Sequence, residues 1–260
     1  MFGLTKTAAI IKKLVKKLFF AKIGKYAPCG IFTPGHLLLF LMCAFAVTML
    51  LIFTHKKSKE QIRGIIKRLL ILVWILEIFR IAYKLYCGDL RFLESYMPLF
   101  FCSIFLYSGL FSSFGKGKLK RAGDVVLATG SLVGGVVFLF YPATSLPDYP
   151  AFHFVSVHSF FYHGSMVYAG LLMLISGYIK LKKSDIWLYA LSVFVMCMAA
   201  FLINAIFRCN LMFISRAFPG AAGKAVFSVL GNFYSPLMVL IHMFAPFYVI
   251  YGICKLNKKP

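Results

Sequence analysis

The sequence predicts an all-α integral membrane protein of about seven transmembrane helices in a bundle, preceded by a basic amphipathic helix at the membrane interface. Of its 260 residues, 61% are hydrophobic and 14% are charged. A soluble domain has about 45–50% apolar and about 25% charged residues. The apolar residues gather in seven stretches, each near the ~20 residues that cross a bilayer as a helix. Such stretches are expected to be helical, because backbone groups in lipid must pair internally.

The chain divides into three parts. Residues 1–30 are basic, and apolar residues recur at helical spacing between the lysines of 4–25. This pattern is typical of a helix that lies in the interface; the alternative is a frayed basic tail. Residues 31–255 form the polytopic membrane domain, and residues 256–260 form a basic C-terminal tail. The seven predicted spans are residues 34–54, 65–87, 96–114, 124–141, 152–179, 186–207 and 232–254.

The basic residues predict the orientation. The loops after the first, third and fifth spans and the C-terminal tail, with their flanking turns, hold 16 Lys and Arg residues, and the opposite loops hold few. The positive-inside rule therefore places the C-terminus in the cytoplasm of a cell-membrane protein and, with seven spans, the N-terminus outside. The seven lysines of residues 1–30 fit an outer position poorly. Either this segment rests on the outer surface or the number of spans differs by one.

The net charge of +22 follows from these loops, so we expect membrane phospholipids as partners and no nucleic acid. The seven cysteines show no CxxC spacing and lie mostly in apolar stretches, which argues against a zinc site or a disulfide framework. We therefore expect no metal and no other cofactor. The basic start lacks an uninterrupted apolar core followed by a small-residue cleavage site, so no cleavable signal peptide is predicted.

Glu77, Arg80 and Lys84 lie on one face of the second span, at spacing i, i+3, i+7. Ionisable residues at membrane depth are costly and are candidates for function. The alternative is an internal ion pair that lowers the cost of insertion. Under both interpretations the face points into the bundle.

The third span begins with the run MPLFFCSI, in which Pro98 suits the first turn of a helix. Cys102 would then lie ~9 Å below the outer boundary, at 1.5 Å per residue. A cysteine there is either a small apolar residue or a nucleophile.

The fifth span carries His153, His158 and His163. Steps of five residues rotate by roughly 140°, so the three do not share a face and do not predict a metal cluster. His158 matches the depth of Cys102 best, and a Cys and a His from different helices could form a thiolate–imidazole pair. The alternative is a histidine bonded to a neighbouring helix.

Polar residues mark the outer end of the sixth span. Asn204, Arg208 and Asn210 suit either contact with a lipid headgroup, since Arg can bind an oxyanion bidentately, or anchoring at the interface. A glycine-containing loop is expected to lead from there to the GNFY segment at 231–234.

The runs MPLFFCSI and FFYHG, with the Asn-rich segment that ends in GNFY, resemble the YwaF family of bacterial integral membrane proteins. A more distant animal relative is an acyltransferase that places arachidonate on ether phospholipids. The resemblance extends over about residues 35–250 and implies acyl transfer through a cysteine thioester with a histidine base. By position the histidine is His163 and the local cysteine is Cys102, while Phe100 stands where the family has a histidine and Leu99 where the animal enzyme has its cysteine.

Two functions remain open. The first is a lipid acyltransferase with Cys102 as nucleophile, His163 or His158 as base, and Arg208 with Asn204 and Asn210 at the headgroup. The second is a non-enzymatic transporter or lipid-binding bundle whose Glu77 face lines a polar pathway. No inverted repeat supports the second.

Overall fold

The computed structural model describes residues 18–87 and 93–256, and within these ranges it contains helices and no strands. Five helical segments are long and apolar enough to cross a membrane, namely Pro34–Thr54, Leu93–Phe114, Gly117–Phe140, Asp185–Phe207 and Gly223–Leu256. The chain is therefore an α-helical membrane protein, as predicted. The predicted second and fifth spans overlap α3 (Lys59–Tyr86), which begins six residues before the prediction, and α7 (Phe154–Ile175), which ends four residues before it; both are long enough but more polar. Of the predicted N-terminal amphipathic helix, residues 1–17 lie outside the described residues.

Capping residues mark the starts of the first two long helices. The N-cap Thr33 accepts a hydrogen bond from the backbone of His36, and Pro34 opens α2 (Pro34–Thr54) at the position where its missing N–H costs least. Ser58 and Gln61 form a reciprocal capping box that starts α3.

The third segment starts differently from the prediction. Pro98 does not lie in the first turn of a helix but in a turn between two short 3₁₀ helices, η1 (Leu93–Tyr96) and η2 (Phe101–Ser103). The α-helix itself, α4 (Ile104–Phe114), begins only after them. The restricted backbone around a proline favours such a turn. Cys102 therefore lies on a 3₁₀ turn ahead of the helix, and not a turn and a half inside it.

The fourth segment is one long helix with a wide turn at its centre. It consists of α5 (Gly117–Val126), the π-helical stretch η3 (Leu127–Ser131) and α6 (Leu132–Phe140). A Cβ at Gly135 would lie 2.8 Å from the carbonyl oxygen of His163. Glycine at this position therefore allows α6 to approach the backbone of α7 at the histidine itself.

The last part of the chain contains one more helix than expected. After α8 (Asp185–Phe207) and η4 (Leu211–Phe213), the predicted glycine-containing loop is partly the helix α9 (Ala221–Leu230). A short turn, η5 (Gly231–Phe233), connects it to α10 (Tyr234–Leu256). The glycines suggested a loop, yet the run AAGKAVFSVL contains enough good helix formers for three turns.

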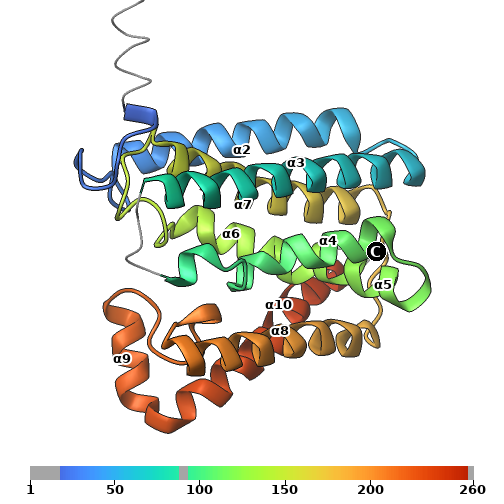
Figure 1. Ribbon diagram of the computed structural model, residues 1–260. Coiled ribbons are helices and arrows are strands. Elements are labelled where there is room, and N and C mark those ends of the chain that lie inside the picture. The colour runs from blue at the N-terminus through green and yellow to red at the C-terminus, as the bar shows by residue number, and fades with distance from the viewer. Residues whose placement is uncertain (1–17, 88–92, 257–260) are drawn as a thin grey trace, which may run out of the picture.

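The helices lie roughly in layers (Figure 1). Helix α7 packs against α2, α3 and α6, while α4 pairs with α5 and also contacts α3. Helices α8 and α10 pack together, and α8 contacts α5. The α2–α3, α4–α5 and α7–α8 connections and the end of α10 lie at one end of the bundle, on the right in Figure 1, and α9 lies at the other. The connections between helices that hold the most lysine and arginine are therefore together at one end with the end of α10.

Candidate active site

A small polar cavity of about 100 Å³ lies between α3, the turn before α4 and the first half of α7. Its volume suits a polar group or a few water molecules rather than a whole lipid. The cavity brings together the ionisable residues that the sequence analysis took from three separate spans. They are Glu77, Arg80, Lys84, Cys102, His158 and His163.

Glu77 and Arg80 form a bidentate ion pair in this cavity. The guanidinium donates from Nε to Oε2 at 2.9 Å and from Nη2 to Oε1 at 2.6 Å. The side chains are 8% and 14% exposed, so the pair is largely withdrawn from solvent and lipid. Lys84, one turn further, is also buried and lies over the Tyr96 ring at 5.7 Å. The three residues share the inward face of α3.

His158 joins the cavity from α7. Its Nε2 lies 3.5 Å from Oε2 of Glu77, close enough for an ion pair when the ring is protonated. Neither ring nitrogen has a hydrogen-bond partner among the described residues, although both are buried. Buried polar groups are nearly always satisfied. His158 can therefore form a hydrogen bond with a polar group of a ligand that enters the cavity.

His163 is held more firmly. Its Nδ1 lies 2.7 Å from the carbonyl oxygen of Ser159, and its ring stacks on Phe138 with a centroid distance of 3.5 Å. A carbonyl only accepts, so Nδ1 carries the proton when the ring is neutral and Nε2 presents a lone pair. An imidazole fixed in this tautomer is arranged as a proton acceptor at Nε2. His153, by contrast, caps α7 by accepting from the backbone of Val155.

Cys102 stands where the polar cavity meets a second, apolar one. The backbone carbonyl of Cys102 accepts a hydrogen bond from the Tyr162 hydroxyl at 3.2 Å, which ties its turn to α7. The apolar cavity has a volume of about 420 Å³ and is lined by α6, α10 and the segment after α8. Phe100, Cys102, Thr144 and His163 line both cavities. The predicted cysteine and histidine therefore share the boundary between a polar and an apolar space.

The segment 208–220 covers part of the apolar cavity, and two asparagines hold it in place. The Asn204 side chain donates a hydrogen bond to the carbonyl oxygen of Leu211 and accepts one from its N–H. The Asn210 side chain forms hydrogen bonds with the backbone of residues 215–217. Arg208, Met212 and Phe213 adopt positive φ values of 53–55°, which non-glycine residues rarely do. The amides expected at a lipid headgroup thus hydrogen-bond within the protein. Arg208 remains exposed.

Several residues at the boundary were not predicted from sequence. Tyr162 and Thr144 carry no spacing signal, because their roles depend on contacts between distant segments. The aromatic side chains of Phe213, Phe218 and His242 line the apolar cavity but are indistinguishable in sequence from ordinary membrane residues. The sequence hints for this part of the chain were Asn204, Arg208 and Asn210 and the GNFY motif, whose Tyr234 donates a hydrogen bond to the carbonyl oxygen of Phe213.

Comparison with known proteins gives one match. The sequence model of the TMEM164 family matches residues 31–257. No curated protein and no solved structure is significantly similar to the chain.

Proposed function

The chain belongs to the TMEM164 family, and from that premise and the two adjoining cavities we propose that it is a membrane phospholipid acyltransferase. The observation that carries the proposal is the position of Cys102 and His163 on the shared wall of a polar and an apolar cavity. The acyl ester of a phospholipid has a polar carbonyl and headgroup and an apolar chain, so each part would match one of the two cavities. The resemblance to the YwaF family and to the animal acyltransferase supports the same chemistry.

In the proposed reaction the Cys102 thiol loses its proton to Nε2 of His163, and the sulfur attacks the ester carbonyl of a phospholipid. The ester C–O bond breaks, and the released alkoxide takes the proton from His163. A lysophospholipid leaves, and the acyl chain remains on Cys102 as a thioester. The hydroxyl of a second lysophospholipid then attacks the thioester, with His163 as base, and restores the thiol.

The other polar residues have supporting roles in this proposal. Glu77 stabilises positive charge on His158, which lies next to the reacting groups in the same cavity. The Thr144 hydroxyl, on the wall of both cavities, is a candidate donor to the developing oxyanion. Arg208 takes the headgroup phosphate, while Asn204 and Asn210 hold the segment that carries it.

We also propose that α3 and α7 cross the membrane, which makes seven spans with the basic loops in the cytoplasm. Helices α3 and α7 are more polar than the other five segments, and this agrees with spanning positions inside the bundle, where their polar side chains do not face lipid. Most residues of α7 are buried, including the two cavity histidines His158 and His163. On α3 the charged pair is satisfied internally.

The proposal is tested by mass spectrometry of purified protein incubated with phospholipids. We expect a hydroxylamine-sensitive acyl adduct on Cys102 that is absent from C102A. The matched control, C87A, removes a cysteine that lines neither cavity and should keep the adduct. H163A should slow adduct formation about 100-fold or more, the usual contribution of a general base.

The same experiment distinguishes an acyltransferase from the non-enzymatic alternative. A protein that retains phospholipid through purification and never acquires an adduct, in any lipid mixture, would be a lipid-binding bundle. An adduct that persists in C102A would remove Cys102 from the mechanism.

A further inference from the structure

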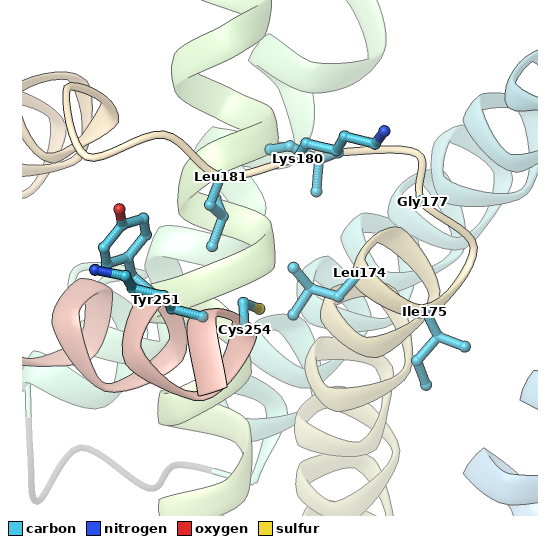
Figure 2. Close-up of a pocket in the computed structure, with 9 residues that line it drawn as sticks. Leu174, Ile175, Gly177, Lys180, Leu181, Tyr251 and Cys254 are labelled. Carbon is cyan, nitrogen blue, oxygen red and sulfur yellow. The ribbon is translucent and has the colours of Figure 1, made fainter. Parts of the chain in front are cut away.

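A second apolar cavity, far from the candidate active site, opens between the last turns of α7 and α10. Its volume is about 420 Å³. Figure 2 shows Leu174, Leu181 and Cys254 directed toward one another across it, from α7, the following loop and α10. The remaining lining residues are Ile175, Gly177, Ile179, Lys180, Tyr251 and Lys255.

This cavity is separate from the proposed catalytic centre. His158 and Leu174 both lie on α7, sixteen residues apart, which corresponds to about 24 Å along a helix. The cavity also lies at the end of the bundle that carries the basic connections (Figure 1). The two sites therefore lie toward opposite ends of the bundle.

The rim of the cavity is positively charged. Lys180 and Lys255 belong to its lining, and among the residues that the structure describes no Asp or Glu does. The nearby carboxylate of Asp185 is engaged with the Arg121 guanidinium and with the backbone N–H of Lys182. In Figure 2 the Lys180 ammonium points away from the apolar walls. The site thus combines an apolar interior with two cations at its edge.

We propose that this cavity binds one anionic phospholipid of the leaflet next to the basic loops. Acyl carbons would pack against Leu174 and Leu181, and the phosphate would lie between Lys180 and Lys255. Lysine suits this position, because its stem packs on apolar surface while its ammonium reaches the headgroup level. Basic pockets between transmembrane helices bind acidic headgroups by the same combination. The inference does not depend on acyl transfer.

The test uses native mass spectrometry of the full chain, delipidated in detergent and titrated with phosphatidylglycerol or with phosphatidylcholine of the same acyl chains. We expect one phosphatidylglycerol to be retained about thirty-fold more tightly than phosphatidylcholine, from two cations near one acidic headgroup. The variant K180Q/K255Q should bind both lipids equally. L181W, which fills the cavity, should lose both, with an unchanged melting temperature as evidence that the protein is folded.

The matched control is K182Q/K183Q, which also removes two positive charges, from residues of the α7–α8 loop that lie outside the cavity lining. It should retain the preference for phosphatidylglycerol. A loss equal to that of K180Q/K255Q would show that the attraction is only general loop charge and would overturn the proposal. So would equal binding of the two lipids by the unaltered chain, or displacement of phosphatidylglycerol by inorganic phosphate at matched concentration.

Discussion

The bidentate contact between Glu77 and Arg80 places two full charges where almost no solvent reaches. Removing charges from water costs several kcal/mol per ion, and a well-aligned partner recovers much of that cost. The spacing i, i+3 on one helix predicts that these two side chains can meet. The approach of His158 could not be predicted, because it depends on how α7 packs against α3.

At this residue, E77Q should destabilise the protein, because it leaves Arg80 buried without a counter-charge. We expect a loss of about 3–5 kcal/mol in the free energy of unfolding, measured by thermal or denaturant unfolding in detergent. The double variant E77L/R80M removes both charges and should recover most of the loss. If the double variant is as unstable as E77Q, the packing of the side chains matters here rather than the charge.

The second prediction for a single residue concerns Asn210. Its amide forms four hydrogen bonds with the backbone of residues 215–217. N210A should release this segment, and its amides should exchange with deuterium about ten- to a hundred-fold faster, since each abandoned partner costs about 1–3 kcal/mol. N232A changes an exposed asparagine of η5 and should leave the exchange unaltered. Unchanged protection in N210A would mean that Asn204 alone holds the segment.

Among the helices, the pairing of α4 with α5 depends on one close approach. A Cβ at Gly123 would overlap the backbone nitrogen of Ser112, so the two helices would have to separate. G123A should therefore cost about 1–3 kcal/mol as an overpacked contact. G252A, in α10 with open space around it, should instead stabilise by roughly 0.5–1 kcal/mol. Melting temperatures of the two variants in the same detergent test this difference, and equal shifts would contradict it.

The sequence predicted the helices themselves better than their ends and irregularities. The first span was placed at residues 34–54, where α2 lies, because a long apolar run marks it clearly. The 3₁₀ turns before α4, the wide turn at 127–131 and helix α9 could not be predicted. The wide turn depends on packing against neighbouring segments, the turn before α4 follows from the backbone around Pro98, and the glycines of α9 suggested a loop instead of a helix. The turn that carries Cys102 is one of these irregular segments. Cys102 was therefore recognised as a candidate from its residue type, but the backbone geometry around it was not predicted.

At the scale of the whole molecule, the collection of basic connections at one end predicts the topology. A cysteine introduced in place of Lys118, which is exposed at the start of α5, should be modified by a membrane-impermeant maleimide in inverted vesicles and not in intact cells. Peptide mapping separates this position from the native cysteines. Modification in intact cells would invert the orientation and with it the leaflet that each cavity faces.

The inward charged face of α3 has a consequence for biosynthesis. Emerging alone from the translocon, α3 would expose Glu77 and Arg80 to lipid, and each such charge is costly at the bilayer centre, at about 2.5–3.5 kcal/mol. Its packing partner α7 begins only at Phe154, roughly 70 residues later. At about 5–20 residues per second this is a delay of roughly 4 to 14 s. We therefore expect nascent α3 to stay beside the translocon, and to enter the bilayer together with α7.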